Sequence, residues 1–367
     1  MTHVYYLLDQ PDHPHGSSSS QDAQWAAGGA PTVRTERPAW LAGPVALVVS
    51  DFDGAHAEQR RLVARGAAVA APLGARAVGL TFWPQPGLPG DFTGPQAGAG
   101  RLLTTLDERL ELLATLHAAD GAPLLAGVVV VANGDALAQR LRAPEAALAQ
   151  LCAWCDVRAL LGLADEAATT LDVAALGSVA AQRGIVVESL AATPDFDPAV
   201  GHADGETDGE TDGARIRALI EVGDMRAATQ RLGYPYRVEG VVGAGDQRGR
   251  LLGFPTANLQ PDPRKALPAN GIYAVRVRLP GERAFTHAGA ANVGIRPTFT
   301  AEGAMPQRLV EVYLLDATFD LYGLTIGVEF VARLRPEQRF SGPNALDELI
   351  QQMARDIQQT RTVLART

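Results

Sequence analysis

The hydrophobic pattern of the chain changes at one acidic segment, and this change constrains the fold more than any other feature. Residues 204–213 alternate acidic residues with glycine and threonine and contain no core-forming side chain, so we expect a solvated loop there. Before this segment, short apolar runs such as residues 45–49 alternate with Ala- and Leu-rich helical segments. That alternation predicts an α/β domain with a Rossmann-like, doubly wound and largely parallel sheet. After it, from Arg237 onward, apolar residues recur at every second position, which predicts an antiparallel β-barrel.

The expected domain organisation follows from these patterns and from the length, because 367 residues are long for one domain and suffice for two. Residues 1–40 combine Ser, Pro and Gly without a sustained period and are expected to be a disordered tail. Residues 41–200 form the expected α/β domain, and residues 201–236 an acidic linker with a short helix. Residues 237–367 form the barrel domain, which ends in a helix.

The individual elements are predicted from their periodicity. Strands are expected at residues 45–49, 77–82, 124–131 and 185–187, and helices at residues 57–73, about 135–151, 173–183 and 216–232. A further helix is expected to place Leu106, Leu110, Leu113 and His117 on one face. The last helix can be capped by Asn344, and its apolar face is expected to cover one side of the barrel with Leu346, Leu349, Ile350, Met353 and Ile357.

Composition excludes several classes of function. A net charge of −9 argues against nucleic acid as a partner. No apolar run reaches the length of a membrane span and no signal pattern is present, so we expect a cytoplasmic protein. Cys152 and Cys155 form a lone C-x-x-C without further zinc ligands nearby and are expected to be buried thiols near a helix end. The only lysine, Lys265, is not followed by Ser or Thr, which excludes a Walker A loop.

One glycine- and arginine-rich segment, residues 248–259, carries the features of a phosphate-binding loop, and the run before it, residues 242–248, is interpreted as a flexible hairpin loop over the phosphates. Its glycines allow close backbone approach to a ligand, and two arginines can bind phosphate oxygens. Thr256 and Asn258 offer oxygen atoms on the same side of an extended chain, as an Mg²⁺–nucleotide complex requires. The candidate nucleotide-binding residues are Gly245, Arg248, Arg250, Gly253, Thr256 and Asn258. A Rossmann fingerprint is rejected because Arg248 occupies the third glycine position and Pro255 follows where a helix should run. A plain hairpin remains open for residues 243–245 alone.

Four motifs in order resemble the riboflavin kinase family: residues 253–258 (Gly-Phe-Pro-Thr-Ala-Asn), 292–299, 310–316 and 321–323. The resemblance implies transfer of the ATP γ-phosphate to riboflavin, with Mg²⁺ held by Thr256 and Asn258 and with Glu311 as general base. Tyr313 stands where histidine is common in relatives. The flavin is expected between the barrel and the last helix, near Phe340 and Leu346. By contrast, Glu329 is interpreted as a solvent-facing strand residue.

The preceding half is similar to the FMN adenylyltransferase module that is usually fused to bacterial riboflavin kinases, but its motifs are degenerate. Asp53, Gly54 and His56 of the expected phosphate loop are present, whereas Glu58 replaces a glycine and Gln59 a second histidine. In addition, Gln85 replaces a histidine, and the flavin loop expected after Cys155 is missing.

The prediction is therefore a riboflavin kinase that uses ATP and Mg²⁺, joined to an inactive adenylyltransferase-like domain. One alternative is a bifunctional FAD synthetase with an atypical N-terminal site. Another is a non-catalytic flavin-binding regulator, against which the joint presence of Thr256, Asn258 and Glu311 argues, since flavin binding alone needs neither metal ligands nor a base.

Overall fold

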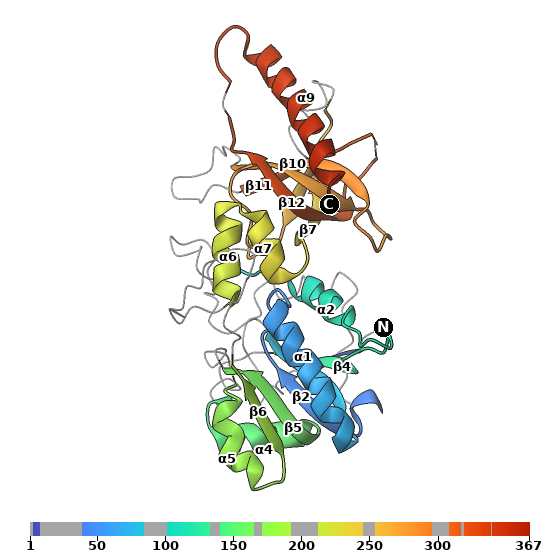
Figure 1. The fold of residues 1–367 in the computed structure, drawn as a ribbon, viewed down its shortest axis with the longest axis vertical. Helices are drawn as coiled ribbons and strands as arrows, with labels where there is room; N and C mark the ends of the chain where they lie inside the picture. Colours follow the sequence, from blue (N-terminus) through green and yellow to red (C-terminus); the bar gives the residue numbers. More distant parts are fainter. Residues whose placement is uncertain are drawn as a thin grey trace, which may run out of the picture. The chain divides into compact units, whose positions relative to one another are not determined.

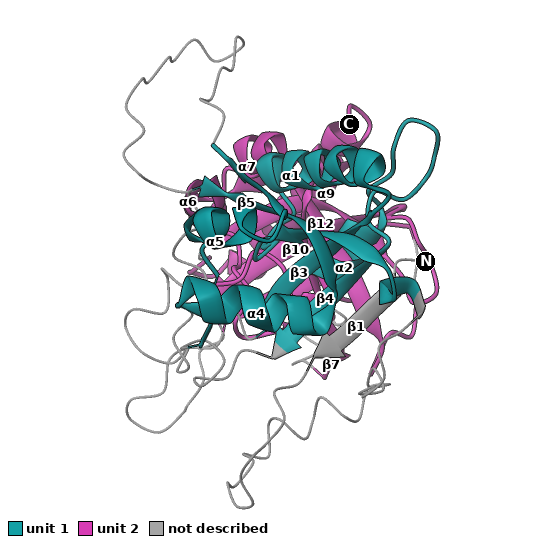
Figure 2. Ribbon diagram, turned by 90° about the horizontal axis from the view of Figure 1, so that it is seen from below, with its two compact units in different colours: residues 1–88, 109–211 teal, residues 89–108, 212–367 magenta. Residues whose placement is uncertain are grey.

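The chain divides into two compact units, which Figure 2 distinguishes by colour. The computed structural model describes residues 3–7, 39–83, 101–132, 140–164, 171–191, 212–244, 254–295, 308–316, 319–338 and 340–367. The first unit consists of residues 1–88 and 109–211, and the second of residues 89–108 and 212–367. Each unit therefore takes in two separate stretches of the chain. None of the helices in the described ranges combines the length and the apolar composition needed to cross a membrane.

The first unit is built on a six-stranded parallel sheet in the order β1-β4-β3-β2-β5-β6. Its strands are β1 (His3–Leu7), β2 (Pro44–Val49), β3 (Arg76–Trp83), β4 (Gly127–Ala132), β5 (Asp156–Leu163) and β6 (Val186–Leu190). From β2 the chain runs outward through β3 and β4, then returns to the other side of β2 with β5 and β6. The strand order therefore reverses beside β2, and ligands of doubly wound sheets bind at the carboxyl ends of the strands at such a point.

Helices cover both faces of this sheet, as a doubly wound fold requires. The helices are α1 (Ala57–Ala70), α2 (Leu106–Ala114), α4 (Pro144–Trp154) and α5 (Gly177–Ala181), with 3₁₀ turns at Ala39–Leu41, Ala71–Leu73 and Ala174–Leu176. On one face, α1 lies so close to β2 that a Cβ on Gly66 would be 2.3 Å from Val48 Cγ2 (Figure 1). Leu47 points the other way and joins the core that α4 supplies with Leu148 and Leu151. The predicted doubly wound sheet is confirmed.

The structure corrects the expectations for residues 3–7 and for His117 in this unit. The predicted disordered tail is wrong for His3–Leu7, which forms β1 and pairs in parallel with β4. This run is rich in β-branched and aromatic residues, which favour strands; residues 8–38 lie outside the described residues. His117 lies beyond the end of α2, because the helix stops at Ala114. The thiols are free as expected, with Cys155 buried and Cys152 half-buried at the end of α4.

The second unit contains a closed six-stranded antiparallel barrel, which confirms the prediction. Its strands follow the order β10-β11-β8-β7-β12-β9 around the barrel. They are β7 (Tyr236–Gly243), β8 (Ala257–Pro261), β9 (Gly271–Arg278), β10 (His287–Ile295), β11 (Arg308–Leu314) and β12 (Thr325–Arg335). Side chains of alternate residues, such as Val275, Val277 and Val328, fill the interior.

The single short helix that was expected in the linker is two helices, and both are part of the barrel unit. They are α6 (Asp212–Val222) and α7 (Met225–Leu232). Gly223, with φ of 83°, separates them, and Asp224 caps α7 by accepting a hydrogen bond from Ala227 N at 3.0 Å. Ile216, Ile220, Met225, Ala228 and Leu232 belong to the same buried cluster as the barrel interior. The linker prediction is therefore wrong from residue 212 onward, and so is the solvated loop at its last two positions, because residues 212–213 begin α6. Residues 204–211 lie outside the described part of the chain.

The last helix, α9 (Ala345–Leu364), packs against β9, β10 and β12, as expected (Figure 1). Its fully buried residues are polar, however: Asp356 and Thr360. Arg335 of β12 donates from Nη2 to Asp356 Oδ2 at 2.7 Å and from Nε to Oδ1 at 2.9 Å. This bidentate pair attaches the helix to the barrel. Leu346 at the start of α9 is 56% exposed, and Asn344 makes no side-chain capping bond, contrary to the prediction.

A short stretch from the first half of the chain completes the second unit. We call residues 101–108 the inserted segment. Leu102 forms an isolated parallel bridge with Lys265, donating from its N to Arg264 O at 2.8 Å and accepting from Ala266 N at 2.8 Å. Leu103 is buried in the same cluster as the barrel interior.

A buried ion pair also joins the inserted segment to the rest of the second unit. Lys265, the only lysine of the chain, forms a salt bridge with Glu108, and the two side chains are 1% and 3% exposed. Lys265 Nζ also donates to Leu103 O at 2.5 Å and lies 4.9 Å from the Tyr236 ring centroid. Glu108 accepts from Thr105 N at 2.8 Å and from Glu239 N at 3.2 Å. Each charge is thus compensated by a partner and by backbone groups, the condition for burying a charge.

Candidate active site

Three polar side chains stand in one row across neighbouring strands of the barrel. Glu311 of β11 is the register partner of Asn258 on β8 and of Asn292 on β10. The residues that flank Glu311 in the strand, Val310 and Val312, are fully buried in the barrel interior. Side chains alternate along a strand, so Glu311 lies on the outer face. The same alternation places Asn258 and Asn292 there, because Leu259 and Val293 belong to the interior cluster.

The two predicted metal ligands lie at the start of β8. Thr256 directly precedes this strand and is half-buried, and Asn258 is 8% exposed. Phe254 packs edge-on against Tyr313 of β11, with ring centroids 5.6 Å apart. The contact with Tyr313 therefore holds the backbone just before Thr256 against β11. Gly245, Arg248, Arg250 and Gly253 lie outside the described residues, so their predicted phosphate contacts stay predictions.

The close approach of β7 and β8 sets the position of Asn258. A Cβ on Gly240 would lie 2.4 Å from the backbone O of Gln260, and one on Gly243 would lie 2.2 Å from Gln260 Nε2. Gly243 is itself the register partner of Asn258. The neighbour of Gly240 is backbone, so glycine at this position allows β8 to lie against β7 at this spacing, whereas at Gly243 the Gln260 side chain could move aside.

Glu311 has an amide neighbour that the sequence reasoning did not assign. Asn292 Nδ2 lies 3.5 Å from Glu311 Oε2, within hydrogen-bonding range. Asn292 was noted only as the first residue of a motif. The alternation of β10 could have identified it, because an amide between Ala291 and Val293 must point away from the barrel interior once both neighbours point into it.

Glu329 is not the solvent-facing residue that was expected. It is 7% exposed and pairs with Arg237, whose Nε lies 2.9 Å from Glu329 Oε1. Burial raises the pKa of the Glu329 carboxyl above its usual value, while the Arg237 charge acts in the opposite direction. The Arg237 guanidinium lies over the Phe285 ring, at 4.7 Å from its centroid. Glu329 is thus a buried structural partner of Arg237.

The candidate phosphate loop of the first unit follows β2, at the point where the strand order reverses. Phe52 and Ala55 have φ values of 52° and 41°, a left-handed backbone that is uncommon for residues other than glycine. Buried Asp53 pairs with buried Arg109 at 3.3 Å. His56 precedes α1, is buried, and makes no side-chain bond that caps the helix.

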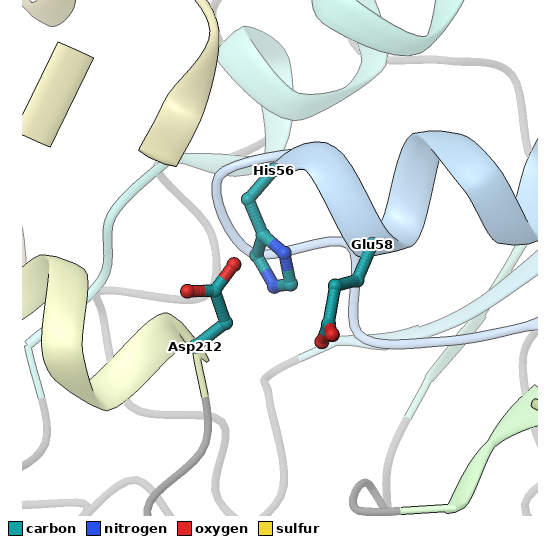
Figure 3. A group of neighbouring side chains, drawn as sticks. All are labelled: His56, Glu58 and Asp212. Atoms are coloured by element: carbon teal, nitrogen blue, oxygen red, sulfur yellow. The ribbon is translucent and has the colours of Figure 1, made fainter. Parts of the chain in front are cut away.

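The residues that depart from the family pattern lie on the first turn of α1. Figure 3 shows the side chains of His56 and Glu58 leaving the start of the helix on the same side. A ring nitrogen of His56 lies within 4.8 Å of a Glu58 carboxylate oxygen. Gln59 is buried, and its Nε2 donates to Asp51 Oδ1 at 2.7 Å and to Ser50 Oγ at 3.2 Å. Gln59 therefore stabilises the two residues that follow β2 by hydrogen bonds.

Comparison with known proteins agrees with the architecture of the second unit. Residues 232–364 match the family model described as riboflavin kinase. The chain is 40% identical over 151 residues to the bifunctional riboflavin kinase/FMN adenylyltransferase of Listeria monocytogenes, covering 41% of this chain and 45% of that protein. It is 42% identical over 141 residues to the protein of the same description from Escherichia coli, covering 38% and 42%. The matched part thus spans less than half the length of these relatives.

A solved structure extends the similarity of fold to most of the chain. The crystal structure of a macrolide-efflux protein from Streptococcus pneumoniae has a TM-score of 0.64 and 22% identity, and covers 87% of this chain and 94% of that one. At this identity the likeness concerns the fold alone. The matched residues 232–364 contain the closed barrel and the terminal helix, so the second unit resembles riboflavin kinases in sequence.

Proposed function

We propose that the chain is a riboflavin kinase that transfers the γ-phosphate of ATP to riboflavin and releases FMN and ADP. The observation that carries the proposal is the row in which Glu311 stands between Asn258 and Asn292 in a riboflavin kinase domain. The test is to incubate the protein with riboflavin and Mg-ATP and to resolve FMN from FAD by chromatography. The free thiols of Cys152 and Cys155 fit a reducing compartment such as the cytoplasm, where we expect the reaction to occur.

The chemistry of the donor set at β8 fits Mg²⁺. Thr256 offers a hydroxyl oxygen and Asn258 an amide oxygen, both hard neutral donors, and Mg²⁺ uses few protein ligands alongside substrate phosphates and water. These two residues would hold the ion. When bound, Mg²⁺ would neutralise charge on the phosphate oxygens.

The residues of the site would then divide the work of phosphoryl transfer. The attacking riboflavin hydroxyl must lose its proton as its oxygen forms a bond to the γ-phosphorus. Glu311 accepts this proton, and the bond between the γ-phosphorus and the bridging oxygen breaks to release ADP. Asn258 and Glu311 are register partners, which keeps the phosphate-side ligand and the base on adjacent strands.

Loss of the β8 oxygen donors is expected to weaken the use of Mg-ATP selectively. Thr256→Val and Asn258→Leu remove these atoms without adding charge. We expect kcat/KM for Mg-ATP to fall at least tenfold. Loss of a residue that only hydrogen-bonds to a metal ligand already costs roughly 10- to 100-fold in metal affinity. Riboflavin binding, followed by flavin fluorescence, should change little. Thr325→Val, at the exposed start of β12, is the matched control. An unchanged Mg²⁺ dependence in both site variants would remove the metal assignment.

The first unit is proposed to lack FMN adenylyltransferase activity. Transfer to the α-phosphate builds negative charge that needs donors and cations in place beforehand. Glu58 brings a carboxylate next to His56, and the Gln59 amide already donates to Asp51 and Ser50. The rival proposal, a bifunctional enzyme, is favoured by the names of the relatives, although the family-model match starts only at residue 232.

The purified protein is therefore expected to form FMN and no FAD. Each lost stabilising donor costs about 100- to 1,000-fold in rate, so the loss of several leaves no measurable turnover. The measurement is chromatography of FMN incubated with Mg-ATP, with a bifunctional relative as the positive control. Steady FAD formation that His56→Ala abolishes would establish the bifunctional alternative instead.

A further inference from the structure

Asn292 has an unusual combination of contacts on the outer face of the barrel. Its Nδ2 lies 3.5 Å from Glu311 Oε2. Its Oδ1 is buried and has no hydrogen-bond partner among the described residues. A buried amide oxygen without a partner costs about 1–3 kcal/mol, so such atoms in native proteins call for an explanation.

The backbone does not require an amide at this position. Asn292 lies in the middle of β10, paired with Glu311 on one side and with Ile272 of β9 on the other. Its side chain therefore neither caps a helix nor shapes a turn, the two usual structural roles of asparagine. β-Branched or aromatic side chains are favoured in strands, and asparagine is depleted there. What distinguishes this site is the carboxylate beside it.

We propose that Asn292 is a positioning residue for Glu311 and a binding residue for the alcohol substrate. Its Nδ2–H donates to Glu311 Oε2, which leaves Oε1 to receive the proton of the attacking hydroxyl. Its Oδ1 accepts a hydrogen bond from a second hydroxyl of the substrate, next to the one that is phosphorylated. The ligand class is a polyol chain, of which riboflavin's ribityl group is an example. This inference rests on the proposed kinase function.

Two further charged residues, Glu337 and Arg308, lie near strand β10. Glu337, after β12, approaches the same strand, since a Cβ on Gly294 would be 2.5 Å from Glu337 Oε1 and 3.7 Å from Asn292 Nδ2. Glu337 accepts from Asn270 Nδ2 at 3.2 Å. Arg308, at the start of β11, donates to Leu267 O at 2.9 Å and to Asn270 Oδ1 at 3.0 Å. The Asn292 amide is thus a neutral donor beside the Glu311 carboxylate, and the Glu337 carboxylate approaches the same strand at Gly294.

The test compares Asn292→Asp and Asn292→Ser with the wild type. The Asp change keeps the shape, removes the donor and adds a like charge next to Glu311. Because this change adds repulsion as well as removing the donor, kcat should fall at least as far as for Asn292→Ser. For Asn292→Ser, kcat should fall roughly tenfold to 100-fold, the effect of losing one hydrogen bond to a charged group, while the KM for Mg-ATP stays within about threefold. The KM for riboflavin should rise.

Controls separate this inference from the kinase proposal. Gln359→Glu makes the same amide-to-acid change at an exposed position of α9 and should leave kcat and both KM values unchanged. Thermal unfolding of each variant verifies the fold, and the Ser variant serves if the Asp variant does not fold. If the wild type forms FMN but kcat and the KM for riboflavin are unaffected by both changes at position 292, the positioning role is wrong and the kinase function stands. A wild type that forms no FMN overturns the kinase function and this inference together.

Discussion

Replacing Glu311 by glutamine is expected to reduce FMN formation by about 100- to 10,000-fold, the usual contribution of a general base. Glutamine has the same shape and can still accept from Asn292 Nδ2, so the barrel should remain intact. The loss should therefore appear in kcat, with little change in the KM for Mg-ATP. Steady-state rates at saturating riboflavin provide the measurement.

Two comparisons make this result specific to the base. Glu221→Gln changes an exposed glutamate on α6 of the same unit and should leave the rate unchanged. Thermal unfolding should place the Glu311→Gln variant close to the wild type. A variant that forms FMN at nearly the wild-type rate would exclude Glu311 as the base.

The second large effect concerns the ion pair between Glu108 and Lys265. Glu108→Gln leaves the Lys265 ammonium buried without a counter-charge. Removing one partner of a buried pair costs about 3–5 kcal/mol, against a typical total stability of ~5–15 kcal/mol. We expect urea unfolding of the second unit to shift to markedly lower concentration. Activity per folded molecule should persist, because neither residue belongs to the β8–β11–β10 row.

A double-mutant cycle identifies the cause of this loss. Glu108→Gln combined with Lys265→Met removes the uncompensated charge and should be more stable than Glu108→Gln alone. Glu188→Gln breaks the exposed pair with Arg65, whose side chain is half exposed, and should change the unfolding midpoint little. Additive effects of the two changes at 108 and 265 would show that burial of the pair does not determine stability here.

The architecture of both units could be predicted from the sequence because burial patterns are local. Residues 45–49 are apolar throughout because their strand is covered on both faces, whereas the barrel strands alternate because one face points inward. The errors arose where tertiary contacts override local pattern. Residues 3–7 were assigned to a tail because residues 1–40 show no sustained period, and only pairing with β4 makes residues 3–7 a strand. Similarly, Glu329 was predicted to face solvent because its ion-pair partner, Arg237, is 92 residues away in the sequence.

Part of the candidate site could be predicted because its residues occur in short sequence motifs. Thr256, Asn258 and Glu311 could be proposed because they occur in motifs, and the register places the last two on adjacent strands. The contribution of Asn292 depends on which residue faces Glu311 across the sheet, and strand register is not contained in a short motif. The predicted roles of Arg248 and Arg250 stay predictions, since these residues lie outside the described part of the chain.

The inserted segment, residues 101–108, limits which deletions this protein can tolerate during evolution. Leu103 and Glu108 are encoded within the first half of the gene, yet their side chains complete the core and the charge balance of the barrel unit. If the first unit is inactive, as proposed, selection on its reaction would not prevent its loss by deletion. Here a deletion extending through these codons would remove the counter-charge of Lys265. Selection for a stable barrel unit would therefore preserve residues 101–108, which are encoded between the two stretches of the first unit.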